Sequence, residues 1–336
     1  MRVVAYNDID RAAWSALVRE SRTGTWFQMP EAYNFFASQP ELFKPFAIGL
    51  ENDGRLRAVC CGYVTVEKSA IKQFLTRRAI IIGGPCFADD ATDDEVAVLM
   101  NAVRKELKSK AIYVETRNFN DYSRWKEAFT KAGFSYQPHL NFHVDTSSVE
   151  VVEANLGKSR KRDIKTTIRD GAFIIEQPTI EQVREYYVIL ENLYRTKVKT
   201  PLFPLSFFET LWRNKDGRFL LVGLDTNHGV EIIGGTVCVA QEGKCLYEWF
   251  VSGRDGEWKS IFPSSYATYA GIKYAAEHNM PRFDMMGAGK PDEAYGVRDF
   301  KARFGGTEVE YGRFLCVTKP LLYKLGTIAV KFLKKI

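Results

Sequence analysis

Two stretches, PFAIGLENDGRLRAVCCGYVTV at residues 45–66 and RFLLVGLDTNHGVEIIGGTVCV at residues 218–239, carry the same pattern. Each has an apolar run, a polar turn that contains glycine, and a second apolar run, which is the pattern of a β-hairpin. Gly49 and Gly223 stand at matching places, 223 − 49 = 174 residues apart. The repeat predicts two related domains rather than a short-period solenoid.

A second pair of matching segments follows the hairpins. WKEAFTKAGF at 125–134 and FKARFGG at 300–306 share an aromatic–Lys–x–x–Phe core, with an offset of 300 − 125 = 175 residues. Before that segment, each half has an apolar-periodic helix, at 94–108 or 263–278, and then a strand, AIYVET or RFDMMG. We therefore expect two α/β (mixed α+β) domains, with antiparallel hairpins feeding mixed sheets that helices flank.

The second half is longer after its strand. Ten residues lead from Glu115 to Trp125, whereas sixteen lead from Asp284 to Phe300. The extra length falls in GAGKPDEAYGVRD, which is either a binding loop grafted on the scaffold or a tolerated surface insertion. GAGK is not a P-loop, because no Ser or Thr follows Lys290 and the glycine spacing differs.

Composition and charge restrict the class of protein without naming a function. The chain has 336 residues, 46% hydrophobic and 26% charged, and its formal net charge of +6 suits a phosphate-bearing partner without requiring one. Its 6 cysteines form no CxxC pair or zinc spacing, which favours a reducing compartment. The sequence shows no signal-peptide core, and no apolar run approaches the roughly 20 residues of a spanning helix. We expect a cytoplasmic protein.

RDFKARFGG, at residues 298–306, places Lys301 directly after Phe300 and three residues before Phe304. A lysine between large apolar groups is either a surface residue with a buried stem or a cation that is kept partly dry. Lys126, beside Trp125, repeats the pattern in the first half without the two glycines, so packing shared through duplication could also explain the motif.

Three segments resemble the FemAB/FemX group of proteins. They are GTWFQMPEAYNFF near the start, TKVKTPLFPLSFF at 196–208 and, most specifically, RFDMMGAGKPDEAYGVRDFKARFGG at 282–306. The resemblance runs through most of the chain in preserved order, and it implies two tandem GNAT-like (acetyltransferase-like) domains. It places domain 1 at 1–148, with 318–336 returning to it, and domain 2, which carries the catalytic segment, at 149–317.

The resemblance implies acyl transfer. Family members move an amino acid from aminoacyl-tRNA to an amine of a cell-envelope (peptidoglycan-type) precursor, and no cofactor is implied beyond the tRNA co-substrate. An aminoacyl ester is already activated, so a positioned amine can attack directly, and a fixed cation stabilises the oxyanion. Lys301 matches the family's catalytic lysine, with Phe300 packing its stem. Two alternatives stay open: an acyltransferase that uses coenzyme A or another thioester in surface-polysaccharide or lipid synthesis, and a GNAT-like binding protein without catalysis.

The resemblance also implies substrate-binding positions. The family's basic residue for a phosphorylated substrate corresponds to Lys199, which can pair with phosphate but lacks the fork of an arginine. A basic residue expected soon after the N-terminal FQ is missing from PEAYNFF, which weakens the case for a nucleotide-linked cell-wall substrate. The other candidates are an acidic residue, three aromatic residues and the glutamine of FQ: Glu115, Tyr247, Trp249, Tyr295 and Gln28. Aromatic residues on strands are also typical of a core.

LGKSRKRDIKTTIRDG, at 156–171, predicts a basic helix. Ser159 can cap its start and Gly171 can end it, while Ile164 and Ile168 can anchor it. Five basic residues fall on one face and could bind phosphate of a tRNA or a precursor, or could simply be solvated: Lys158, Lys161, Arg162, Lys165 and Arg169.

The tail, residues 320–336, predicts a basic amphipathic helix that starts at Pro320. Apolar residues recur at helical spacing in the tail, while lysines fill the other face and no acid follows Glu310. The helix could contact an anionic membrane on its cytoplasmic side, or it could pack its apolar stripe on domain 1, which the family pattern favours.

Two further patterns carry no function. HLNFH, at 139–143, has metal-ligand residue types but no clustered third ligand, so we expect no metal. Neither half shows the Gly-rich turn with which acetyltransferases hold the pyrophosphate of coenzyme A, which argues against an acyl-CoA donor.

Overall fold

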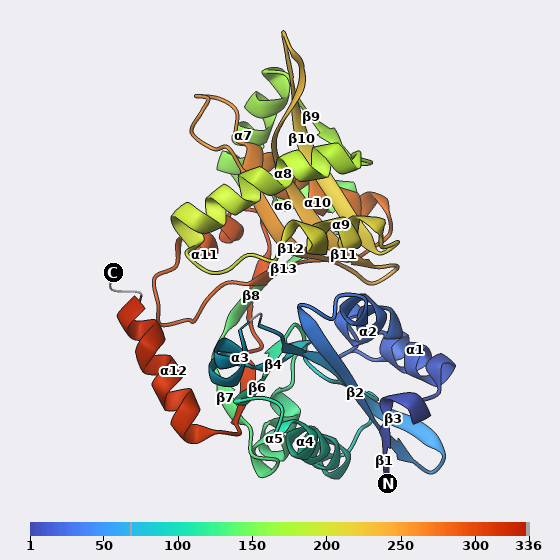
Figure 1. The fold of residues 1–336 in the computed structure, drawn as a ribbon. Helices are drawn as coiled ribbons and strands as arrows, with labels where there is room; N and C mark the ends of the chain where they lie inside the picture. The colour runs from blue at the N-terminus through green and yellow to red at the C-terminus, as the bar shows by residue number, and fades with distance from the viewer. Residues whose placement is uncertain (68, 334–336) are drawn as a thin grey trace. The chain divides into compact units, whose positions relative to one another are not determined.

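The computed structural model describes residues 1–67 and 69–333 (Figure 1). The chain forms two compact units, Met1–His139 with Glu310–Ile336, and Leu140–Val309. These limits lie nine and eight residues before the predicted boundaries at 148/149 and 317/318, since 148 − 139 = 9 and 317 − 309 = 8. The reason is strand pairing, because β8 (Leu140–Asp145) joins the second sheet and β15 (Arg313–Val317) joins the first.

The first unit is built on a mixed sheet with the strand order β1-β2-β3-β4-β6-β15-β7, and β5 pairs with β3. The further strands are β1 (Arg2–Ala5), β2 (Phe43–Asn52), β3 (Arg55–Thr65), β4 (Ala79–Gly83), β5 (Cys86–Phe87), β6 (Tyr113–Asn118) and β7 (Ser135–Gln137). Its helices are α1 (Arg11–Glu20), α2 (Pro30–Ala37), α3 (Ala70–Thr76), α4 (Asp93–Leu107), α5 (Lys126–Lys131) and α12 (Pro320–Leu333), with short 3-10 turns at Tyr6–Asp8, Trp26–Gln28 and Ser123–Trp125.

Helices cover both faces of this sheet. Cys60 and Cys61 are neighbours on β3, so their side chains point to opposite faces: Cys60 joins the core under α4 and Cys61 the core under α1. The start of α4 is fixed by a capping box, in which Thr92 and Glu95 bond each other's backbone N–H groups. Glu95 also pairs with Arg57 of β3 at 3.0 Å, which ties the helix to the sheet.

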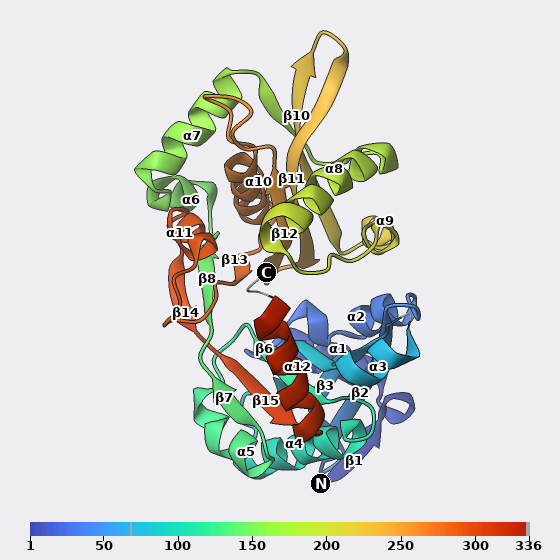
Figure 2. The same cartoon turned by 60° about the vertical axis from the view of Figure 1, so that its left-hand side comes forward.

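The second unit has a sheet with the strand order β14-β8-β13-β12-β11-β10-β9 (Figure 2). Its further strands are β9 (Ala172–Ile175), β10 (Gly217–Thr226), β11 (Gly229–Gln241), β12 (Cys245–Gly253), β13 (Arg282–Gly287) and β14 (Thr307–Glu310). Its helices are α6 (Val149–Asn155), α7 (Lys158–Arg169), α8 (Ile180–Leu193), α9 (Leu205–Arg213), α10 (Pro263–Glu277) and α11 (Gly296–Ala302), with a π-helical turn at Tyr194–Val198. Helix α10 packs along β11 and β12, where its side chains join the main core of the unit.

The two sheets repeat one arrangement, as the paired glycines predict. The order β1-β2-β3-β4-β6-β15-β7 corresponds strand by strand to β9-β10-β11-β12-β13-β8-β14. Gly49 and Gly223 each pair with a residue of the edge strand, Val4 or Phe173. A Cβ atom at Gly49 would lie 2.7 Å from the Val4 side chain, and one at Gly223 would lie 3.0 Å from the Phe173 side chain. The predicted hairpins are confirmed as β2–β3 and β10–β11, and the predicted helices as α4 and α10.

The copies differ at their parallel strand pair. In the first sheet β4 and β6 pair over five residues, from Ala79 to Gly83 on β4. In the second sheet β12 and β13 pair at Leu246–Phe283 and Tyr247–Asp284, and no further pair joins them among the described residues. The register of β13 against β8 also shifts between Asp284 and Gly287, where Met286 has a φ of 58°. Peptide groups at the end of β13 therefore need partners other than β12.

The predicted tail helix begins at Pro320 and is described as α12 as far as Leu333. Residues 334–336 of the predicted helix lie outside the described residues. No helix in the described part of the chain is long and apolar enough to cross a membrane.

Candidate active site

Lys301 of α11 is buried, with 7% of its surface exposed. Its ammonium group donates hydrogen bonds to the carbonyl oxygens of Met285 and, at 2.9 Å, Gly287. Both acceptors lie at the end of β13, where the strand no longer pairs with β12. Lys301 thus supplies the hydrogen-bond donors that the end of β13 does not receive from β12. The third N–H of its ammonium group has no hydrogen-bond partner among the described residues.

The residues after Lys301 hold it in place. Phe304 is buried in the core of the second unit. Gly305 has a φ of 78°, and a Cβ atom there would lie 2.1 Å from the carbonyl oxygen of Asn155, so only glycine fits this turn. The FKARFGG motif therefore combines the lysine, a core anchor and a tight turn.

Two carboxylates act on the Lys301 ammonium. Burial lowers the pKa of Lys301, while the charges of Glu248 on β12 and Asp284 on β13 oppose that shift. Asp284 is fully buried, accepts a hydrogen bond from the Met286 backbone N–H at 2.7 Å, and lies 3.1 Å from the Nε2 atom of His143. The site is therefore an ionic cluster inside the second unit.

Glu248 has spare acceptor capacity. Its Oε1 atom accepts hydrogen bonds from the hydroxyls of Thr236 at 3.2 Å and Thr268 at 2.9 Å. Its Oε2 atom is buried and has no hydrogen-bond partner among the described residues. Burial raises the pKa of Glu248, against the opposing effects of Lys301 and the two hydroxyls. A buried oxygen without a partner costs free energy, which points to a group used for chemistry or for charge balance.

Phe300 lies under a second cation. Its ring is half-buried and faces the guanidinium of Arg160 at 4.6 Å, while Phe304 faces the same group at 5.1 Å. Arg160 of α7 is buried and pairs with Asp163 at 3.1 Å. The predicted packing of Phe300 on the stem of Lys301 stays a prediction.

The inserted segment after β13 is pinned to α11. Arg298 donates hydrogen bonds to the carbonyl oxygens of Ala288 at 3.1 Å, Lys290 and Pro291. Most residues of this segment from Lys290 to Val297 are exposed, among them Tyr295, which precedes α11. The insertion is thus an ordered surface loop that adjoins the lysine-bearing helix.

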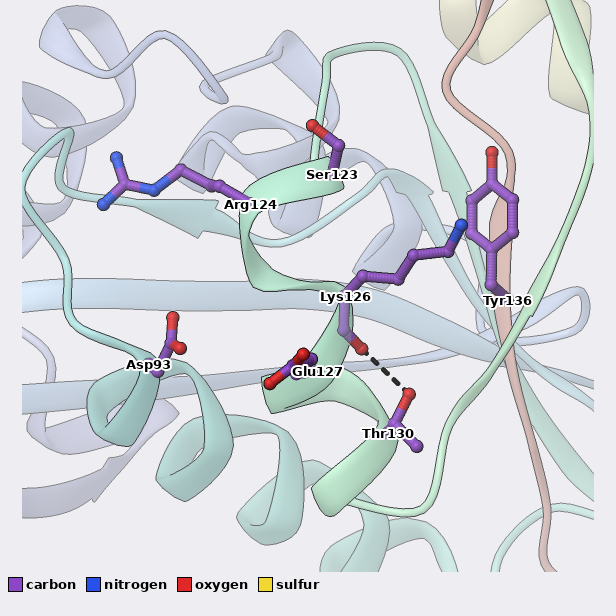
Figure 3. Close-up of a pocket in the computed structure, with 7 residues that line it drawn as sticks. All are labelled: Asp93, Ser123, Arg124, Lys126, Glu127, Thr130 and Tyr136. Carbon is purple, nitrogen blue, oxygen red and sulfur yellow. Dashed lines mark hydrogen bonds between the residues drawn. The ribbon is translucent and has the colours of Figure 1, made fainter.

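The first unit carries the counterpart of Lys301 in a different setting. Lys126 is exposed, and its ammonium lies 3.7 Å from the centre of the Tyr136 ring (Figure 3). It lines a surface pocket of about 520 Å³ together with Asp93, Ser123, Arg124, Glu127, Thr130 and Tyr136. This open pocket has no buried ionic cluster like that around Lys301, so duplication alone does not produce a dry lysine.

Two predicted aromatic residues lie on β12. Tyr247 is fully buried, and its hydroxyl donates to Gln241 at 3.1 Å. Trp249 is half-buried and packs against Phe207 and Phe250. Tyr247 is therefore a core residue that a substrate cannot reach, which corrects the prediction that it lines a cleft.

Gln28 and Glu115 belong to the first unit and stabilise its sheet. The buried amide of Gln28 accepts a hydrogen bond from the Cys61 N–H at 2.8 Å and donates to the carbonyl oxygens of Cys61 and Ile82. Glu115 pairs with Arg117 at 2.7 Å and Arg313 at 3.2 Å, and the two cations outweigh burial and lower the pKa of Glu115. These contacts give both residues structural roles, and none of them points to a substrate.

The predicted basic residues are exposed. Lys199 follows the π-helical turn with a φ of 55° and faces solvent, and the five basic residues predicted for α7 are also exposed: Lys158, Lys161, Arg162, Lys165 and Arg169. The predicted cap is wrong, because α7 begins after Gly157, whose Cβ atom would lie 2.6 Å from the Arg303 carbonyl oxygen. Ile168 does not anchor the helix as predicted, since it is exposed, whereas Ile164 is buried.

Glu248 and Arg160 were not predicted. Glu248 interrupts the apolar strand LYEWFV, and a charge inside such a run is a signal of a buried functional group. Arg160 stands among five other basic residues, and helical periodicity alone does not separate the inward cation from its neighbours. No group of three or more potential metal ligands comes together within residues 1–67 and 69–333.

The fold defines the class of protein. A solved FemX structure is similar with a TM-score of 0.74 at 13% identity, over 97% of this chain and 99% of that chain. A tandem GNAT protein from the clavulanic acid biosynthesis pathway has a TM-score of 0.56 at 8% identity, over 94% of this chain and 98% of that one. The C-terminal domain of a putative lysylphosphatidylglycerol synthetase from Agrobacterium fabrum has a TM-score of 0.58 at 13% identity, over 95% of this chain and 96% of that one. The predicted pair of tandem GNAT-like domains is confirmed.

The sequence itself matches a family over part of its length. Residues 225–331 match the model of the FemAB family, and this stretch contains Glu248, Asp284 and Lys301. The predicted resemblance to the FemAB/FemX group is thereby confirmed, and the match supports a transferase of the FemAB type. No curated protein matches the chain.

Proposed function

We propose that this chain is an acyltransferase that moves an aminoacyl group from aminoacyl-tRNA to an amine of a cell-envelope precursor. The observation that carries the proposal is the buried ammonium of Lys301, which is held on two backbone carbonyls and is acted on by the charges of Glu248 and Asp284, in the stretch that matches the FemAB family. A dry, fixed cation of this kind stabilises negative charge far more than an exposed one.

The chemistry needs no covalent enzyme intermediate. The acceptor amine, once deprotonated, attacks the ester carbon, so a C–N bond forms and the carbonyl oxygen becomes an oxyanion. The intermediate collapses when the C–O bond to the tRNA ribose breaks, the attacking nitrogen gives up one proton, and the ribose oxygen takes up one proton. In this proposal the unpaired N–H of Lys301 donates to the oxyanion, while Met285 and Gly287 fix the direction of the ammonium group.

Glu248 is the positioning residue of this mechanism. Its negative charge favours the charged form of Lys301 and so offsets the burial that would otherwise neutralise it. The hydroxyls of Thr236 and Thr268 hold the carboxylate in place. Without Glu248, Lys301 would lose its proton more readily and would be a weaker donor to the oxyanion.

Exposed cations support the choice of a phosphate-rich donor. The basic face of α7 is solvent-exposed along the helix, as phosphate contacts require. Coenzyme A also carries phosphates, so a thioester donor is the second candidate, with an amine in surface-polysaccharide or lipid synthesis as the acceptor.

The test measures transfer of radiolabel to an envelope-precursor extract from two donors, bulk tRNA charged with labelled amino acids and labelled acyl-coenzyme A. We expect label from the charged tRNA, and we expect Lys301→Met to lose a hundredfold or more of the rate. The matched variant Lys126→Met should keep the wild-type rate, because the exposed lysine touches no buried charge.

Each contrary result has its own meaning. Label from acyl-coenzyme A alone would replace the tRNA proposal with the thioester one. An inactive wild-type protein with every donor would favour a binding protein without catalysis.

A further inference from the structure

Exposed apolar side chains gather on two helices of the first unit. Leu321 is 80% exposed and Ile71 is 73% exposed, and apolar side chains that gather in one patch, unlike single exposed ones, mark an interaction surface. Six such residues lie on α3 and α12, which contact each other: Ile71, Phe74, Leu75, Leu321, Leu325 and Ile328. We call these six residues the two-helix face. Of the apolar stripe predicted for the tail, Leu321, Leu325 and Ile328 face outward, and the choice between packing and membrane contact stays a prediction.

Both helices are anchored through their other sides. Gln73 of α3 accepts a hydrogen bond from the Glu67 N–H at 2.5 Å and donates to the Thr65 carbonyl oxygen at 3.0 Å. Tyr323 of α12 packs edge-on against Tyr113, with ring centres 5.5 Å apart. Thr318, just before α12, donates to the Ala111 carbonyl oxygen at 2.6 Å. The two-helix face is therefore the outer surface of docked helices.

The two segments that carry this face are basic in sequence. Residues 69–78 and 311–336 contain no Asp or Glu and nine Lys and Arg residues, of which Arg313 pairs with Glu115. Lys324 and Arg78 are exposed, and the guanidinium of Arg77 lies 5.8 Å from the centre of the Phe74 ring. A second copy of the chain would bring like charges together here, whereas an anionic bilayer would offer both an apolar interior and opposite charge.

We propose that the two-helix face docks on the surface of an anionic phospholipid bilayer. The six apolar side chains enter the boundary between headgroups and acyl chains, and exposed cations such as Lys324 and Arg78 pair with lipid phosphates. This binding is peripheral, and it does not depend on the proposed acyl transfer, because it uses no residue of the Lys301 cluster.

The experiment is flotation of the full chain with two kinds of vesicle, phosphatidylcholine alone and phosphatidylcholine mixed with an equal part of phosphatidylglycerol. We expect the chain to float with the anionic vesicles and to be released by added salt. Leu321→Ser with Leu325→Ser should lower the partition coefficient more than about tenfold, since each leucine loses its burial in lipid. Lys324→Gln should lower it about fivefold.

Val188→Ser is the matched control. Val188 of α8 is also an exposed aliphatic residue but belongs to the second unit, so its loss should not change vesicle binding. Circular dichroism checks that each variant is folded. Equal binding to both vesicles, no binding, or an unchanged partition of the double leucine variant would overturn the proposal. A solution dimer that the leucine changes dissociate, without vesicle binding by the wild type, would assign the face to a second copy instead.

Discussion

Lys126 and Lys301 stand at matching positions of the two repeats, yet one lies across the Tyr136 ring at the surface and the other is buried on two backbone carbonyls. The difference follows from the sheets. In the first unit β4 and β6 stay paired, whereas in the second β12 and β13 part after Tyr247 and Asp284. The carbonyl oxygens at the unpaired end of β13 can accept hydrogen bonds from a buried ammonium group. Among its described residues the first unit has no such strand end, so its lysine serves as an internal comparison for Lys301.

Changing Glu248 should shift the pH dependence of the reaction. Glu248→Gln keeps an oxygen for the two threonine hydroxyls but removes the charge that raises the pKa of Lys301. Because the oxyanion needs protonated Lys301, the fall in rate at high pH should begin at lower pH in the variant. Full pH–rate profiles measure this. Glu242→Gln, which changes an exposed carboxylate that pairs with Arg218, is the control and should keep the wild-type profile.

Lys301 should also make the free energy of unfolding depend on pH. Burial lowers its pKa below the ordinary 10.5, so between these two values the unfolded chain holds a proton that the folded chain has lost. The contribution of this lysine to the free energy of unfolding therefore rises as the pH rises between the two pKa values. Burial of Lys301 destabilises the folded chain most at a pH below both values, where the buried group is charged. Denaturant unfolding of wild type and Lys301→Met across this range should show a stability difference that changes with pH. The difference between wild type and Lys126→Met should stay constant, and a constant difference for both variants would contradict a buried, charged Lys301.

Changing Gln28 should lower the free energy of unfolding and should not affect substrate binding. Gln28→Met keeps the length of the side chain but leaves the Cys61 N–H and two carbonyl oxygens without their partners. We expect a loss of about 3 kcal/mol in the free energy of unfolding. Gln137→Met, on an exposed edge strand, should change it little. A stable Gln28→Met protein with a raised KM would instead restore Gln28 as a substrate-binding residue.

Asp163 lies between two arginines that differ in burial. Arg160 pairs with it at 3.1 Å with 8% of its side chain exposed, and Arg162 at 3.3 Å with 75% exposed. Arg160→Met should cost about 3 kcal/mol, because it leaves a buried carboxylate without its buried partner. Arg162→Met should cost almost nothing, because solvent already screens that pair. Thermal unfolding of the two variants compares them directly, and equal losses would contradict the assigned burial.

The sequence pattern predicted the repeat well because its signals are local. The paired glycines, the turns and the helical periodicities each depend on a few neighbouring residues, and they recovered both hairpins and both central helices. The exchange of β8 and β15 between the sheets was less visible, since a strand looks the same whichever sheet it joins. That is why the observed limits of the units lie before the predicted ones.

The site was predicted only where a motif carries it. Lys301 stood out through its aromatic neighbours and glycines, but its partner Glu248 sits on another strand and is recognised only when the fold brings the two together. Tyr247 and Gln28 show the converse, because an aromatic or amide group has the same sequence signal in a core as in a binding site. Burial and hydrogen-bond partners separate these cases, and both depend on tertiary structure.

The most direct measurement is the rate of aminoacyl transfer from charged tRNA by Lys301→Met and Lys126→Met, each checked by circular dichroism to be folded. We expect a loss of a hundredfold or more for Lys301→Met and the wild-type rate for Lys126→Met. A folded Lys301→Met protein that transfers the acyl group at the wild-type rate would rule out the proposed catalytic role of Lys301.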